Sequence, residues 1–120
     1  MKSTEAVESL AALAQETRLA IYRLLVESGP EGLAAGVIAE RLGVTPATLS
    51  FHLKELARAG LVTPPTASRF IYYSASFERM AALMTYLTEN SCCGMPGECL
   101  APMETALSRC GSTNGKESCA

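Results

Sequence analysis

One stretch of the chain decides its fold: Gly43-Val44-Thr45-Pro46-Ala47-Thr48-Leu49-Ser50-Phe51-His52-Leu53-Lys54-Glu55-Leu56. Its first glycine supplies the left-handed residue with which helices commonly end. Thr45 is then a favoured capping residue, and Pro46 suits the first position of a helix. We therefore predict a helix that begins here and runs to about Ala59, where Gly60 ends it.

The residues before the turn predict a second, shorter helix. From Leu33 to Leu42 the apolar side chains, including Val37 and Ile38, fall on one side at helical spacing. In the helix after the turn, the stripe expected to be buried is Leu49, Leu53 and Leu56. Two short helices joined by a turn that contains glycine make a helix-turn-helix.

The flanking segments complete a winged helix-turn-helix. Leu61-Val62-Thr63 and Phe70-Ile71-Tyr72-Tyr73 are rich in strand formers, and residues 64–68 between them predict the turn of a hairpin. Three more helices are predicted from apolar residues at helical spacing, namely 4–14 (Val7, Leu10, Leu13, Ala14), 16–27 (Leu19, Tyr22, Leu25, Val26) and 76–88 (Phe77, Met80, Leu83, Met84, Leu87). The expected fold is mainly α, with the element order α-α-α-α-β-β-α.

Length and composition fit one small globular domain followed by a short extension. The chain has 120 residues, of which 48% are hydrophobic and 18% charged, and disordered proteins are more polar than this. We expect residues 1–89 to form the winged domain, residues 90–110 a cysteine-rich segment and residues 111–120 a disordered tail. No apolar run is long enough to cross a membrane or resembles a signal peptide, so we expect a cytoplasmic protein without a membrane partner.

The outward face of the predicted helix after the turn is the candidate DNA-reading surface. Because the net charge is −2, DNA contact requires a local patch. Opposite the leucine stripe lie hydroxyl, cationic and small side chains that suit bases and phosphates, together with Phe51, which can meet a thymine methyl group. Arg69, at the end of the hairpin turn, is a candidate phosphate contact from the wing. The candidate DNA-binding residues are Thr45, Ala47, Thr48, Ser50, Phe51, His52, Lys54, Arg58 and Arg69.

Two simpler interpretations stay open for this region. The two short helices can be an ordinary helical corner with a polar outside, although the hairpin that follows argues against it. His52, the one histidine of the chain, projects to the flank of the leucine stripe, where it either packs or touches a phosphate. A metal-ligating role for His52 is the weaker alternative.

Several segments together resemble the ArsR/SmtB family of metal-sensing repressors. They are residues 14–25 (AQETRLAIYRLL), residues 44–56 (VTPATLSFHLKEL), residues 59–62 (AGLV) and the pair Tyr72-Tyr73. The similarity extends over roughly residues 5–88. It implies a homodimeric winged-helix repressor of double-stranded operator DNA, with the first and last helices at the dimer interface and an inducer that lowers operator affinity. Its reading helix would be Thr45 to Ala59. Family wings are usually more basic than residues 64–69, and Pro46 and Phe51 stand where polar residues are common.

The candidate sensor is a cluster of three cysteines after the last predicted helix: Cys92, Cys93 and Cys99. Three thiolates without a histidine select soft ions, and glycine and proline between them permit a tight turn. Arsenite, with antimonite as a second effector, needs only three sulfur ligands, and the cluster resembles that of arsenite-responsive members of the family. Zinc, cadmium or lead could recruit Cys110 or a water as a fourth ligand. Thiol oxidation is a further alternative, and we expect auxiliary or nonessential roles for Cys110 and Cys119.

The sequence therefore predicts a DNA-binding repressor, of an arsenic-resistance operon, that is released by trivalent arsenic or antimony. The competing class is a thiol-based metal carrier, which would show no salt-dependent binding to promoter DNA. No catalytic triad, phosphate-binding glycine loop or carboxylate pair is recognisable. We therefore expect neither an enzyme nor a catalytic cofactor.

Overall fold

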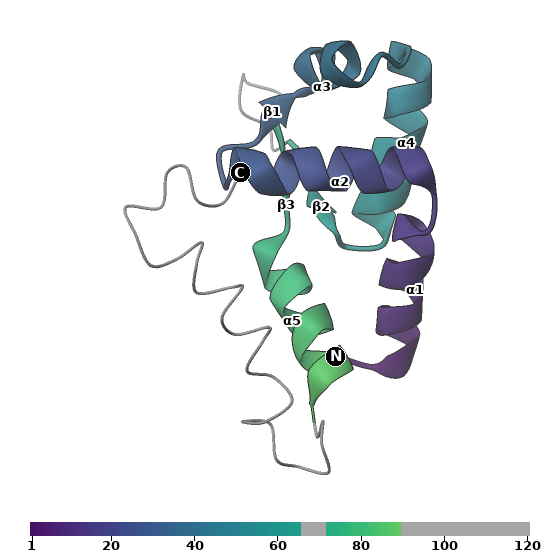
Figure 1. Ribbon diagram of the computed structural model, residues 1–120, viewed down its shortest axis with the longest axis vertical. Helices are drawn as coiled ribbons and strands as arrows, with labels where there is room; N and C mark the ends of the chain where they lie inside the picture. Colours follow the sequence, from purple (N-terminus) through teal and green to yellow (C-terminus); the bar gives the residue numbers. More distant parts are fainter. Residues whose placement is uncertain (66–71, 90–120) are drawn as a thin grey trace. The chain divides into compact units, whose positions relative to one another are not determined.

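A computed structural model describes residues 1–65 and 72–89 of the chain. The chain divides into two compact units, Met1–Leu83 and Met84–Ala120. The first unit contains the helix-turn-helix and a small antiparallel sheet, drawn from purple to green in Figure 1. The mainly helical winged fold predicted from the sequence is confirmed.

Two helices precede the helix-turn-helix, and both begin with side-chain caps. α1 (Ser3–Leu13) begins after Lys2, whose backbone N–H donates to the Glu5 carboxylate at 2.9 Å. That hydrogen bond is the main reason why the pKa of Glu5 lies below its ordinary value. α2 (Glu16–Ser28) begins after Gln15, whose side-chain oxygen accepts the backbone N–H of Arg18 at 2.9 Å.

The helix-turn-helix consists of α3 (Ala35–Leu42) and α4 (Pro46–Arg58). Gly43 ends α3 in the left-handed conformation with φ at +67°, and the Thr45 hydroxyl accepts the N–H of Thr48 at 3.2 Å. Pro46 lies in the first turn of α4, where a backbone N–H would have no partner within the helix, so proline costs no hydrogen bond there. The predicted turn, cap and helix start are all confirmed.

The sheet has three strands where the sequence predicted two. The strands are β1 (Leu33–Ala34), β2 (Val62–Thr63) and β3 (Tyr72–Ala75), in the order β1-β3-β2. β3 pairs antiparallel with both neighbours. The prediction of helix from Leu33 onward was therefore wrong by two residues, because pairing with β3 holds Leu33 and Ala34 extended.

The core of the first unit lies between α2, the helix-turn-helix and the sheet. α2 runs across β3 and also contacts α1, α3 and α4 (Figure 1). The leucine stripe of α4 is buried as predicted, with each of its three side chains at most 2% exposed. The other large, fully buried apolar residues are Ile21, Leu25, Ile38 and Leu61.

Two predicted apolar stripes differ from the faces that are buried. α1 buries its small residues Ala6, Ser9 and Ala12, whereas Val7 and Leu10 are 61% and 43% exposed. On α2, Tyr22 and Leu25 are buried as expected, but Leu19 is 45% exposed. Small side chains allow α1 to pack closely on the domain. The sequence prediction was wrong here because it looked for large apolar residues at helical spacing, and those lie on the other face of α1.

α5 (Phe77–Thr88) follows β3 directly and crosses the boundary between the two units. Its first turn is capped by the Ser76 hydroxyl, which accepts the N–H of Arg79 at 3.2 Å. None of the helices in residues 1–65 and 72–89 is long and apolar enough to span a membrane.

Candidate nucleic-acid interface

The face of α4 opposite its leucine stripe is open to solvent. Its exposed residues are Ala47, Thr48, Ser50, Phe51, Lys54 and Arg58. Side chains that alternate with a buried stripe on a helix must point away from the core. The structure therefore brings these six predicted DNA-facing residues onto one surface, which a major groove can accept. Thr45 is exposed at the start of this surface, where its hydroxyl caps the helix.

Phe51 is the large apolar side chain on this surface. Its side chain is 54% exposed, although aromatic rings are normally buried. The ring meets His52 edge-on with centroids 5.5 Å apart, and the guanidinium carbon of Arg18 lies 5.8 Å from the Phe51 centroid. A cation at this distance from an aromatic face is weakly attracted to it. His52 and Arg18 thus contact the Phe51 ring from the protein side, while much of the ring remains exposed to solvent.

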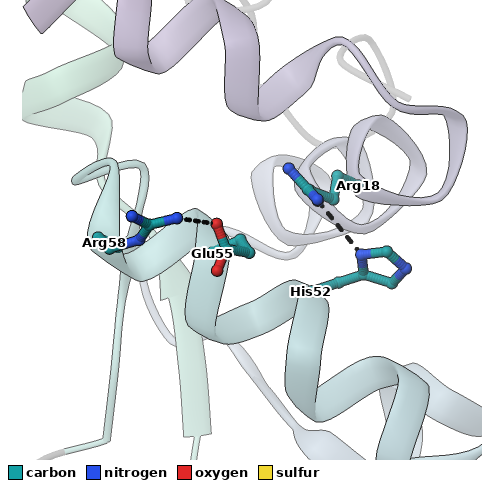
Figure 2. Close-up of polar contacts among 4 residues, drawn as sticks. All are labelled: Arg18, His52, Glu55 and Arg58. Carbon is teal, nitrogen blue, oxygen red and sulfur yellow. Dashed lines mark hydrogen bonds and ion pairs between the residues drawn. The ribbon is translucent and has the colours of Figure 1, made fainter.

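His52 packs against α2 instead of pointing outward with its neighbours. It is 8% exposed, and its Nδ1 accepts a hydrogen bond from Nε of Arg18 at 3.2 Å (Figure 2). Of the two roles left open by the sequence, the structure shows the packed one. Because Nδ1 accepts, the ring proton of neutral His52 lies on Nε2.

Arg58 carries positive charge at the far end of the same surface. It forms an ion pair with Glu55, one turn earlier on α4 (Figure 2). The Arg58 side chain is 75% exposed, and exposed ion pairs contribute little to stability. A DNA phosphate can therefore replace Glu55 as the partner of Arg58 at little cost to the fold.

An open pocket of about 490 Å³ lies between α1, α2 and α4. Its lining is Glu8, Ala11, Ala12, Arg18, Glu55, Arg58 and Ala59. Two guanidinium groups and two carboxylates therefore meet at the edge of the DNA-facing surface. Such a mixture suits a charged group that enters from solvent better than an apolar ligand.

Some predicted site residues lie outside the part of the chain that the structure describes. They are Arg69 of the wing and all five cysteines, including Cys92, Cys93 and Cys99. Within residues 1–65 and 72–89, no three histidine, cysteine, aspartate or glutamate side chains gather as metal ligands would. The sulfur site therefore stays a prediction from the sequence.

Arg18 is the residue near this surface that sequence reasoning missed. It lies 34 positions before His52, and no local pattern connects the two residues. Only the packing of α2 across α4 brings them together. The available signal was the position of Arg18 in the QETRL stretch at the start of α2.

Comparison with known proteins gives one consistent class. Residues 13–65 match the family described as helix-turn-helix domain. An HTH-type transcriptional regulator of Bacillus subtilis, YceK, is 41% identical over 76 residues, which cover 63% of this chain and 72% of YceK. The transcriptional activator HlyU of Vibrio cholerae is 32% identical over 75% of this chain and 81% of its own length.

A solved structure has the same fold over most of the chain. It is an ArsR-like transcriptional regulator from Rhodococcus sp. RHA1, with a TM-score of 0.61 and 27% sequence identity. The similarity covers 88% of each chain. The helix-turn-helix, the exposed face of α4 and these relatives all indicate binding to DNA, and none of them indicates an enzyme.

Proposed function

Because the chain belongs to the ArsR-like family of helix-turn-helix transcriptional regulators, we propose that it is a homodimeric repressor that trivalent arsenic or antimony releases from its operator. In this proposal the effector binds Cys92, Cys93 and Cys99. Binding to operator DNA follows from the family. Repression, the effector and the dimer are our proposals.

One observation carries the choice of effector: three cysteines within eight positions directly after α5. Thr88 is the last residue of α5, and Cys92 is the fourth residue after it. Thiolates bind soft, thiophilic ions, and trivalent arsenic completes its shell with three of them. Cys92, Cys93 and Cys99 supply that number without a ligand from elsewhere. Tetrahedral zinc would need a fourth ligand.

Release requires the effector to bind the DNA-free form more tightly than the DNA-bound form. Coupling between an effector site and a second site typically amounts to about 1–3 kcal/mol. The cysteines follow α5, the helix that the family resemblance assigns to the dimer interface. A change in the geometry at the end of that helix would alter the spacing of the two α4 helices, and two successive major grooves accept only one spacing.

Exposed apolar side chains on α1 support the homodimer. Val7, Leu10, Ala11 and Ala14 recur at helical spacing, and all four are exposed in the single chain. A stripe of this kind is expected to be covered by another surface. A second copy of the chain supplies the same stripe, as a two-fold interface requires.

Effector titration of the DNA-bound protein tests the sensor. Fluorescence anisotropy of labelled promoter DNA from the protein's own gene would be followed with arsenite, antimonite, cadmium and zinc. We expect arsenite and antimonite to release the wild-type protein, with an apparent DNA affinity at least about fivefold weaker, as a coupling of about 1 kcal/mol requires. Cys92→Ser, Cys93→Ser and Cys99→Ser should each stay bound.

Two further variants serve as matched controls. Cys110→Ser and Cys119→Ser remove thiols from the same part of the chain, and we expect both to respond like the wild type. Arsenite release that persists in all three cluster variants would disprove the sensor. Release by cadmium, zinc or peroxide but not by arsenite would assign the cluster to a divalent ion or to oxidation instead.

The direction of regulation needs its own measurement, because the relative HlyU is described as an activator. A reporter driven by the protein's own promoter would be compared in cells with and without the protein. We expect reporter expression to fall when the protein is present and to recover on arsenite addition. Expression that rises with the protein would identify an activator.

The dimer is tested by placing a charge on the α1 stripe. Leu10→Glu changes an exposed residue, so each protomer should still fold, whereas burial of that carboxylate in a dimer interface would be costly. Light scattering of the wild type should give twice the chain mass and that of L10E the chain mass, with unchanged helical circular dichroism. Glu8→Gln on the same helix is the control. A wild-type monomer would disprove the dimer.

A further inference from the structure

Arg18 on α2 lies beside the DNA-facing surface of α4 without belonging to it. One nitrogen of its guanidinium, Nε, is fixed by the hydrogen bond to His52, and the group lies over the ring of Phe51. His52 points inward and Phe51 outward, so the guanidinium stands where the core ends and the exposed face begins. Figure 2 shows Arg18 reaching from its helix toward α4.

No carboxylate lies within ion-pair distance of Arg18 in the part of the chain that the structure describes. Arg58 and Arg23 each have a glutamate within ion-pair distance, on their own helices. The contacts of Arg18 are an imidazole nitrogen and an aromatic ring, and neither cancels a full charge. After Nε is used, the two terminal nitrogens still carry four N–H donors.

We propose that Arg18 is a DNA-contacting residue, whose guanidinium binds a backbone phosphate beside the groove that α4 enters. His52 acts as a positioning residue, because its bond to Nε fixes the direction of the guanidinium plane. Arg58 lines the same open pocket, so a phosphate at its mouth would meet positive charge from two helices. Guanidinium groups suit phosphate because they donate two parallel hydrogen bonds.

The carboxylates of the pocket do not prevent this contact. Glu55 is paired with Arg58, and the carboxylate that remains is Glu8 on α1. Glu8 is exposed, where salt and water screen its charge. Glu8 should nevertheless weaken DNA binding slightly, because its negative charge lies in the same pocket, so its removal should strengthen binding.

The test separates the charge of Arg18 from its packing. Arg18→Gln removes both the charge and the guanidinium geometry, whereas Arg18→Lys keeps the charge and loses the His52 bond. Arg23→Gln is the matched control, because it removes one exposed arginine from the same helix. Binding of each full-length variant to its promoter DNA and to unrelated duplex DNA would be measured at several salt concentrations, together with thermal unfolding.

A phosphate contact makes a distinctive prediction. Because each phosphate contact releases counterions, losing one contact lowers the steepness of log K against log salt by about 0.9 for each bound protomer. At roughly 0.15 M salt that corresponds to about fivefold weaker binding per protomer for R18Q, equally on promoter and unrelated DNA. R18K should keep the wild-type slope, R23Q should match the wild type, and Glu8→Gln should bind more tightly.

Three results would overturn the assignment. An unchanged salt slope in R18Q would show that no phosphate contact is lost. A slope that falls equally in R18K, which keeps the positive charge, would show that the change in R18Q is not the loss of a cation bound to a phosphate. An equal loss of DNA affinity in R23Q would show that the effect comes from the net charge of the protein and not from a contact at Arg18. If R18Q unfolds at the assay temperature, the slope of R18K and the affinity of E8Q still decide the question.

Discussion

Replacing Gly32 with alanine perturbs the point where β1 joins the sheet. The residue has a φ of +76°, and an added methyl group would lie 2.8 Å from the carbonyl carbon of Tyr73 on β3 and closer still to its oxygen. Both obstacles belong to the backbone, so no side-chain rotation can relieve them. The chain can accept the methyl group only if β1 moves away from β3.

Gly43 provides the matched comparison, because it has a similar φ of +67° but no atom within 4 Å of an added methyl group. Gly43→Ala should therefore cost only the left-handed conformation, about 1 kcal/mol. Gly32→Ala carries the same cost and also separates Leu33 from its partner Tyr73. If the separation costs about two hydrogen bonds at about 1 kcal/mol each, the free energy of unfolding of Gly32→Ala should fall by roughly 3 kcal/mol or more in total.

Urea unfolding at one fixed protein concentration measures both costs. For a slope of about 2 kcal/mol per M, the midpoint should fall by about 0.5 M in Gly43→Ala and by about 1.5 M in Gly32→Ala. Circular dichroism at 222 nm and tyrosine fluorescence should report the same transition. Equal midpoints for the two variants would refute the argument that the approach of β3 to Gly32 requires glycine.

Substitutions at three other positions test the core, the helix cap and the DNA-facing surface. The buried Tyr22 hydroxyl has no partner within the described residues, and burial raises its pKa above the ordinary 10.0, so the fold disfavours the phenolate. Stability should therefore be full below pH 10 and fall as the pH rises through the folded-state pKa, whereas Tyr22→Phe should gain about 1 kcal/mol in a urea titration and lose that alkaline dependence. Thr45→Ala removes the cap of α4 and should cost about 1 kcal/mol of unfolding free energy, with Thr45→Ser restoring most of it. Phe51→Ala should weaken promoter binding by about tenfold and binding to unrelated DNA much less, if its exposed ring meets a base as predicted; equal losses on both DNAs would contradict base contact.

Local chemistry made the helix-turn-helix predictable. The left-handed glycine, the threonine cap and the proline at the helix start each act within a few residues, and the α4 stripe has one large apolar residue per turn. The exposed DNA-facing surface follows from that stripe by geometry alone. Signals of this kind need no knowledge of the rest of the chain.

The features that the sequence did not reveal depend on residues far apart along the chain. Leu33 and Ala34 are a strand because β3 lies beside them, nearly 40 positions later. The bond from Arg18 to His52 exists because α2 crosses α4. The cysteines of the predicted sulfur site lie outside the described residues, so the prediction rests only on the sequence spacing of Cys92, Cys93 and Cys99.

The apolar stripe predicted for α1 is exposed, but it still indicates a surface that another molecule could cover. Its small residues Ala6, Ser9 and Ala12 face the domain, and Ser9 is fully buried although its hydroxyl has no partner in the described residues. α1 packs so closely on the domain that this position requires a small side chain, and serine is small enough although it is polar. Val7 and Leu10 are too large for this face and lie outside. α1 thus has a small-residue face that packs on its own domain and an exposed apolar face that, in the proposed dimer, a second copy of the chain would cover.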